Sequence, residues 1–326
     1  MKFLNKRMTI ILLLVLVCTF ATISVSQDFK SKEVNLPTIA QHTTSNTISD
    51  LLIYDIHYSI KTLDLLGETY NFSELSSKIR QLDVKAYLSG QNSLYNLWLL
   101  SEMNKQVNTK PKDINSISDY ILNLQSPNGY FPSYSGERIN NKLNYLSSTK
   151  MVIDICSYYD INPDFERLEQ WIQEISLTLS NTGSKEDFLS FGGYTASLKQ
   201  IDDYYYKKTG KHSVDANVYK NMLDKLKYKY STMENSIEKY DTALNLEQHF
   251  GAKIFKIDKR ALQDYMKRAQ LQNGSFPMFG NQGEDSLSTF IAINVLKSLQ
   301  LKIPKELELK SHLKQVLNES LVSIKN

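Results

Sequence analysis

Carboxylates near the starts of predicted helices are the side chains of this sequence best suited to chemistry. Asp241 and Asp285 lie where apolar helical runs begin, and Glu137 lies in a long polar loop. Two carboxylates a few ångström apart can act as general acid and general base on a glycosidic bond. We therefore name all three as candidate catalytic residues. The structural alternative is helix stabilisation by about 0.3–1 kcal/mol, and Asp285 has the position of a capping residue.

Aromatic side chains form the second candidate set, because the chain has 20 tyrosines. Tyr134, Tyr194 and Tyr204 lie around predicted turns and apolar helical segments. Aromatic faces in a cleft suit sugar rings or an apolar chain. We name these three tyrosines, together with Glu284, as candidate ligand-binding residues. The alternative is that tyrosine simply fills and borders a helical core.

Other chemistries are disfavoured by charge and spacing. The net charge is only +3 and basic residues are interspersed with acidic ones, so we expect no nucleic-acid partner. The five histidines show no metal-ligand spacing. Asp154 and Cys156 are two residues apart in a predicted helix, where side chains face in different directions. We expect no metal site and no cofactor, and the sequence has no glycine-rich phosphate loop or nucleophile elbow.

An internal repeat must position these residues. One copy has Gln125, Gly129 and Phe131-Pro132, followed after a polar loop by Ser148-Thr149 and an apolar run; the second has Gln270, Gly274 and Phe276-Pro277, followed by Ser288-Thr289. Asn-Gly supplies the left-handed backbone that closes a helix. Ser and Thr offer hydroxyl caps for the next helix. Each copy therefore predicts a helix, a glycine turn, a loop and a second helix.

Helical periodicity extends this frame across the chain. The first-series helices, which are the more apolar, are predicted near 50–66, 92–104, 146–159, 193–207, 237–250 and 286–299. The amphipathic second-series helices are predicted near 73–82, 114–125, 164–180, 214–228, 258–270 and 305–323. A degenerate copy of the turn is predicted at 191–194. Pairing the first helix with the last predicts an all-α, closed α/α toroid of about six helical hairpins, because an open stack would need polar caps.

The repeated Gln-x-x-x-Gly-x-Phe turn resembles that of the prenyltransferase and squalene-cyclase repeat family. The two clear copies cover about 85 residues, and weaker copies extend across 47–326. The resemblance implies an α/α toroid but no particular activity, because this architecture carries both enzymes and binding domains. The family's catalytic motifs are missing: the chain has no Asp-x-Asp-Asp run. Asp202-Asp203 begins an Asp-Asp-x-x-Asp motif, but Tyr204-Tyr205-Tyr206 follows.

The N-terminus has the layout of an export signal. Lys2, Lys6 and Arg7 precede an uncharged apolar run that ends near Val25. Residues 1–26 are therefore predicted to be a signal peptide or a membrane anchor. Residues 27–46 are predicted to be a flexible tether, and residues 47–326 the toroid domain. We expect an extracytoplasmic protein that is either secreted or held at the cell membrane, with membrane contact only through the N-terminal segment.

Three functional hypotheses remain open at this point. The first is a non-catalytic toroid that binds a small molecule, a glycan or a protein partner, and it predicts no paired, desolvated carboxylates. The second is an enzyme acting on an extracellular glycan, and it predicts two carboxylates with several tyrosines along one cleft. The third is a terpene-cyclase-like or prenyltransferase-like enzyme, and it predicts a deep apolar cavity with an acid at one end.

Overall fold

The fold is all-α, as the sequence predicts. The computed structural model describes residues 50–82, 84–88, 92–137, 141–183, 185–277 and 283–324. These residues form twelve α-helices and two 3-10 helices, and their extended pairing is a single bridge between Pro277 and Glu284. No helix in the described part of the chain is long and apolar enough to cross a membrane. The predicted signal or anchor at 1–26 and the tether at 27–46 lie outside the described residues.

The observed helices follow the two predicted series closely. The first-series helices are α2 (Asp50–Leu65), α4 (Ser93–Gln106), α6 (Tyr145–Tyr159), α8 (Phe188–Thr209), α10 (Ile237–Phe250) and α12 (Ser286–Ser298). The second-series helices are α3 (Phe72–Gln81), α5 (Ile114–Leu124), α7 (Phe165–Thr182), α9 (Ala216–Thr232), α11 (Lys259–Ala269) and α13 (Glu306–Ser323). The 3-10 helices are η1 (Val84–Tyr87) and η2 (Lys142–Asn144).

The predicted turn at 191–194 is wrong, because these residues belong to α8. Asp187 caps α8 five residues earlier than predicted, and its carboxylate accepts hydrogen bonds from the Ser190 backbone N–H at 2.8 Å and hydroxyl at 3.1 Å. Gly192 and Gly193 are buried inside the helix. Glycine in a helix costs about 1 kcal/mol relative to alanine, so the cap and burial outweigh the local preference for a turn.

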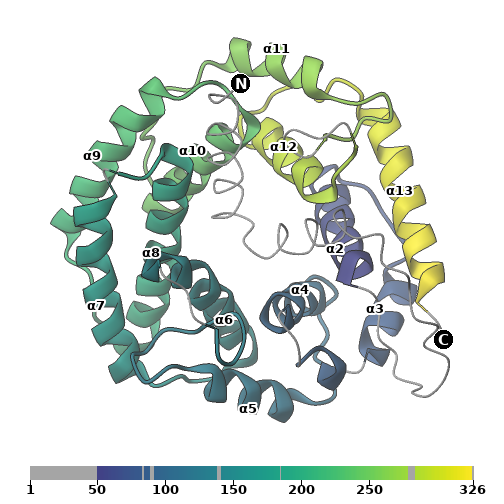
Figure 1. Cartoon of the computed structure of the whole chain (residues 1–326). Coiled ribbons are helices and arrows are strands. Elements are labelled where there is room, and N and C mark those ends of the chain that lie inside the picture. The colour runs from purple at the N-terminus through teal and green to yellow at the C-terminus, as the bar shows by residue number, and fades with distance from the viewer. Residues whose placement is uncertain are drawn as a thin grey trace, which may run out of the picture. The chain divides into compact units, whose positions relative to one another are not determined.

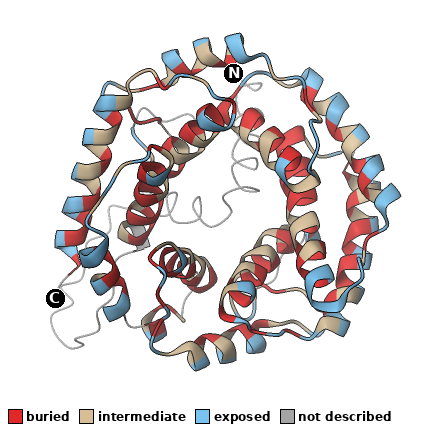
Figure 2. Ribbon diagram, turned by 180° about the vertical axis from the view of Figure 1, so that it is seen from behind, coloured by how far each residue is buried: buried red, intermediate tan, exposed pale blue. Residues whose placement is uncertain are grey.

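The described helices fall into two compact units. Unit 1 comprises residues 88–95 and 116–229, and in it α8 packs against α6 and α7. Unit 2 comprises residues 50–87, 96–115 and 230–324, and in it α12 lies between α2 and α10 while α13 packs on α2 (Figure 1). Figure 2 shows that the second-series helices combine a buried stripe with an exposed one, the pattern of helices with one face on a core.

The repeated turn makes the same contacts in both units. In unit 2 the Gln270 amide donates to the Gly274 carbonyl at 2.8 Å, and its oxygen accepts from the Lys305 backbone N–H at the start of α13 at 3.1 Å. In unit 1 the Gln125 oxygen accepts from the Asp164 backbone N–H at the start of α7 at 2.8 Å. The glutamine side chain therefore ties the end of one second-series helix to the beginning of the next.

The phenylalanine, threonine and glycine of the repeat also make equivalent contacts in its two copies. The Phe131 backbone N–H donates to the Thr149 hydroxyl at 3.0 Å, and the equivalent bond from Phe276 to Thr289 is 2.9 Å. Both phenylalanine side chains are fully buried. Gly129 has φ +91° and Gly274 has φ +86°, and a Cβ on either would meet the backbone of the next second-series helix at 2.0 Å and 2.6 Å. Only glycine fits there.

Candidate functional site

Asp285 caps a helix in unit 2, as its position in the sequence suggests. Its carboxylate accepts from the Ser288 backbone N–H at 2.7 Å and from the Tyr54 hydroxyl at 2.7 Å. On the neighbouring helix α2, Asp55 accepts from the Ser286 hydroxyl at 2.6 Å. Two carboxylates from different helices thus meet at the N-terminus of α12, where the helix dipole and free N–H groups stabilise negative charge.

Burial alters the acidity of this group. The pKa of Asp55 is raised, mainly by burial and further by the negative charges of Asp285 and Glu284, although the bond from Ser286 opposes the rise. Burial and the Asp285 charge also raise the pKa of Tyr54 well above its usual value. The Tyr54 hydroxyl therefore stays protonated and keeps donating to Asp285.

Asp241 lies on the adjacent helix α10 and has a carboxylate neighbour. Glu238 precedes it by three residues, so the two side chains share one face of the helix, with Cβ atoms about 5–6 Å apart. Burial and then the Glu238 charge raise the pKa of Asp241 to about 7, while a hydrogen bond with Asn294 of α12 opposes the rise. Burial raises the pKa of Glu238 to about 6. Its Oε2 is buried without a hydrogen-bond partner among the described residues.

These groups belong to three packed helices, and we refer to them together as the polar face of unit 2. Its members are half-buried side chains of α2, α10 and α12, together with the residue that caps α12: Asp55, Glu238, Asp241, Asp285, Ser286 and Asn294. Ser286 and Asn294 are eight residues apart on α12, and half-buried Phe290 lies between them. Eight residues correspond to about 12 Å of helix. The Asp55–Asp285 pair and the Glu238–Asp241 pair are therefore two separate acidic positions in unit 2.

Glu284, Glu137 and Tyr134 lie in loops. Glu284 is exposed, accepts from the Asn273 amide at 2.5 Å and lies 2.9 Å from His312 Nε2. Glu137 belongs to unit 1, where it accepts from the Ser133 backbone N–H at 2.6 Å, and burial raises its pKa. Tyr134 lies half-buried in the same loop.

Tyr194 and Tyr204 pack the core of unit 1. Tyr194 is 2% exposed and donates its hydroxyl to the Asn144 side chain at 2.8 Å. Tyr204 is 6% exposed and donates to the Ile161 carbonyl at 3.2 Å. Burial raises the pKa of both hydroxyls. These contacts fit the alternative in which tyrosine fills a helical core.

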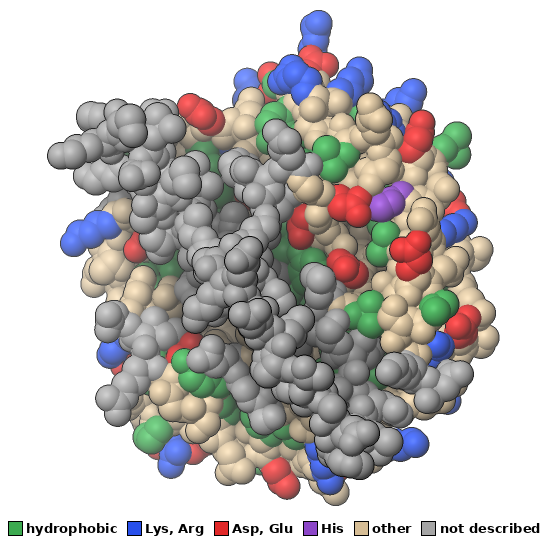
Figure 3. All heavy atoms as spheres, turned by 45° about the vertical axis from the view of Figure 1, so that its right-hand side comes forward, with side chains coloured by type: hydrophobic (Ala, Val, Ile, Leu, Met, Phe, Trp, Pro, Cys, Tyr) green, Lys and Arg blue, Asp and Glu red, His purple; other side chains and the backbone are tan. Residues whose placement is uncertain are grey.

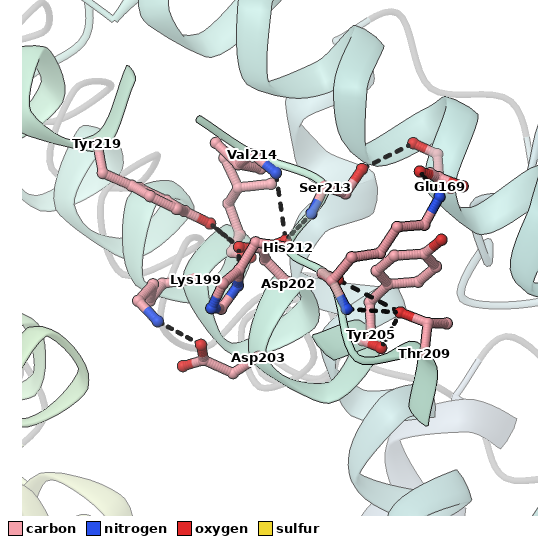
Figure 4. Close-up of polar contacts among 12 residues, drawn as sticks. Glu169, Lys199, Asp202, Asp203, Tyr205, Thr209, His212, Ser213, Val214 and Tyr219 are labelled. Carbon is pink, nitrogen blue, oxygen red and sulfur yellow. Dashed lines mark hydrogen bonds and ion pairs between the residues drawn. The ribbon is translucent and has the colours of Figure 1, made fainter. Parts of the chain in front are cut away.

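A second polar cluster surrounds Asp202 in unit 1 (Figure 4). The buried Asp202 carboxylate accepts from the Ser213 backbone N–H at 2.7 Å and lies 2.9 Å from His212 Nδ1. Tyr219 donates to it from α9 at 3.4 Å. Glu247 of unit 2, 45 residues after Asp202, also accepts from backbone N–H groups of the turn that follows its helix, those of Ile254 and Phe255. Because the arrangement repeats with the predicted period, we assign both carboxylates to the turns between helices.

Sequence reasoning missed Glu238. The available signal is its spacing of three residues from Asp241 on a predicted helix, which places two carboxylates on one face. The described residues hold no group of three or more His, Cys, Asp and Glu side chains arranged for a metal ion. Cys156 is buried, and burial raises its pKa to about 12, so its thiol is not activated as a nucleophile.

Comparison with known proteins gives no relative from which a function could be carried over. The chain matches no protein-family model, no curated protein and no solved structure. The class defined by the described residues is therefore an all-helical protein with two equivalent glycine-turn repeats.

Proposed function

We propose that the chain is an exported α/α toroid that binds a neutral, hydroxyl-rich ligand, such as a glycan fragment, through the polar face of unit 2. Support for the toroid comes from the alternation of two helix series. It also comes from the glutamine hydrogen bonds of the two repeated turns, which connect successive second-series helices. The resemblance to the prenyltransferase and squalene-cyclase repeat family belongs to this proposal. The binding role rests on one observation: Asp241, Asn294 and Asp55 present half-buried acceptors along packed helices.

The chemistry of this face selects for hydroxyl donors. Carboxylate and amide oxygens accept hydrogen bonds from sugar hydroxyls, and the half-buried Phe290 offers an aromatic surface between them. Acidic sugars would bring like charge to the four carboxylates of the face and are disfavoured. The expected ligand is therefore a neutral sugar or an amino sugar, and uronic-acid oligosaccharides should bind more weakly.

Binding is favoured over hydrolysis because the three candidate catalytic residues have separate tasks. Asp285 caps α12 and Glu137 holds a loop in the other unit. Asn294, which bonds Asp241, lies about two helical turns along α12 from Ser286, which bonds Asp55, a separation of roughly 12 Å along the helix. Glycosidase carboxylates stand about 5–10 Å apart.

The alternative, a glycan-acting enzyme, is favoured by one observation, which departs from the expectation that a non-catalytic toroid has no paired, desolvated carboxylates. Glu238 and Asp241 form a pair with pKa values of about 6 and 7, which is suited to one acid and one base near neutral pH. This enzyme would use two carboxylates of the same helix rather than the three that the sequence singles out.

Calorimetric titration of the full chain with neutral, amino and uronic-acid oligosaccharides tests the proposal. We expect binding of a neutral or amino sugar, weaker binding of uronates, and at least tenfold weaker binding by Asp241→Asn. Asp264→Asn, which removes an exposed carboxylate of α11, serves as the matched control and should bind like the wild type. Binding that Asp241→Asn leaves unchanged would refute the site, and slow product formation during the titration would favour the enzyme.

A further inference from the structure

The helix α11 and the loop before it carry an unusual excess of positive charge. Residues 251–270 contain six basic and two acidic residues, so their excess of four exceeds the net charge of +3 of the whole chain. The side chains of Lys256, Arg260, Lys267 and Arg268 are exposed and form no ion pair or hydrogen bond with another described residue. We call these four residues the basic face of α11. Figure 3 shows Lys and Arg side chains gathered over this helix at the top of the view.

Several basic residues elsewhere in unit 2 are already paired. Lys314 and Lys310 form ion pairs with Glu68 at 2.6 and 3.1 Å. Lys78 donates to the Leu321 carbonyl at 2.5 Å, and Lys85 pairs with Asp113 at 2.8 Å. The four side chains of the basic face of α11 differ from these in having no such partner among the described residues.

Local acidic residues do not neutralise this face. Asp258 is used as the cap of α11, where it accepts from the Arg260 and Ala261 backbone N–H groups at 3.0 Å. Glu247 is buried and already holds Lys253 and two backbone N–H groups. Asp264 is the remaining acidic residue of α11, and one carboxylate cannot balance four cations.

The spacing of the charges fits a broad anionic surface. Arg260 and Lys267 are seven residues apart, which places them on one side of the helix about 10 Å from each other. Arg268 is adjacent, and Lys256 lies in the loop before the helix. Cations on an exposed helix face can reach several headgroups of a bilayer at once, whereas a single small anion would contact only one or two of them.

We propose that the basic face of α11 docks unit 2 on an anionic lipid surface. Each Lys or Arg near such a surface strengthens binding about fivefold, the equivalent of about 1 kcal/mol. Four such residues give weak binding by themselves, but a second attachment makes it stable. The apolar run predicted at 8–25 would supply that attachment if it is retained as an anchor. This inference is independent of the ligand proposed for the polar face.

Vesicle flotation of the full chain tests this proposal. The bound fraction is measured on vesicles of phosphatidylcholine alone and on vesicles with 30% phosphatidylglycerol, at low and at high salt. The test variant carries Lys256→Gln, Arg260→Gln, Lys267→Gln and Arg268→Gln. The matched control carries Gln at four exposed lysines elsewhere, Lys105, Lys110, Lys112 and Lys220. Both variants therefore have the same net charge.

The anionic lipid should increase wild-type binding by roughly several hundredfold at low salt, and high salt should abolish the increase. The α11 variant should lose the increase and the control should keep it, while binding to phosphatidylcholine stays equal in all three. Equal loss in both variants would overturn the proposal, because net charge would then explain the result. No lipid dependence in the wild type, or equally strong binding to soluble polyphosphate, would also overturn it.

Discussion

Replacing Asp241 by Asn should make unit 2 more stable at alkaline pH. Burial beside Glu238 raises the pKa of the Asp241 carboxyl from 3.8 to about 7. A carboxyl with a raised pKa contributes its full stability below the unfolded pKa and loses it as pH rises through the folded pKa. Ionisation of this group therefore lowers the free energy of unfolding of the wild type as pH rises from about 4 to about 7. The uncharged Asn does not ionise and should not show this loss.

The size of the effect follows from the shift. A change from 3.8 to about 7 corresponds to about 4 kcal/mol, which is an upper limit because Asp241 is only half-buried. We expect Asp241→Asn to raise the free energy of unfolding by about 2 kcal/mol at pH 8 and by less than about 1 kcal/mol at pH 5. A polar residue kept at a cost in stability is typical of functional sites.

Urea unfolding at the two pH values measures this difference. The chain has two tryptophans, Trp98 in unit 2 and Trp171 in unit 1. In a Trp171→Phe background, Trp98 fluorescence reports on unit 2. Asp264→Asn serves as the control for loss of one carboxylate and should change neither value by more than about 0.5 kcal/mol. An Asp241→Asn gain that is the same at both pH values, or a loss at pH 8, would refute the assigned burial of this carboxyl.

Three further predictions concern the repeat and the core of unit 2. Gly274→Ala should cost at least about 2 kcal/mol, because φ is +86° and the new Cβ would lie 2.6 Å from the Leu309 nitrogen; a melting temperature equal to the wild type would contradict this. Gln270→Ala should cost about 2–4 kcal/mol, since it leaves the Lys305 N–H and the Gly274 carbonyl without a partner, and thermal unfolding would show it. His57 is fully buried with both nitrogens unpartnered among the described residues, and burial lowers its pKa. The wild type should therefore lose stability as pH falls below about 6.5, by at most about 1.4 kcal/mol per pH unit, and His57→Leu should reduce that slope in acid denaturation.

Helix positions could be predicted from the sequence because they depend on local patterns. Apolar spacing and the Asn-Gly turns located most ends within two residues, as at α10 and α12. The start of α8 was missed because the buried glycine pair Gly192-Gly193 imitates a turn, while the capping role of Asp187 becomes visible only in three dimensions. A local pattern thus fails where packing supports an unfavourable residue.

The candidate site was predicted less well because it depends on burial and on contacts between distant residues. Spacing alone could not reveal that Asp285 receives the Tyr54 hydroxyl or that Asp241 bonds Asn294. Tyr194 is deeply buried although its sequence position resembles that of an exposed turn residue. The net charge of +3 for the whole chain likewise hides the local excess of positive charge in residues 251–270.

Hydrogen exchange in the presence of a neutral oligosaccharide tests the central claim most directly, because it locates the ligand on the full chain. Binding at the polar face of unit 2 predicts slower exchange in α10 (Ile237–Phe250) and α12 (Ser286–Ser298), with α6 and α8 of unit 1 unchanged. The same protection should be missing in Asp241→Asn. Protection confined to unit 1, or the same protection in the variant, would contradict the proposed ligand site.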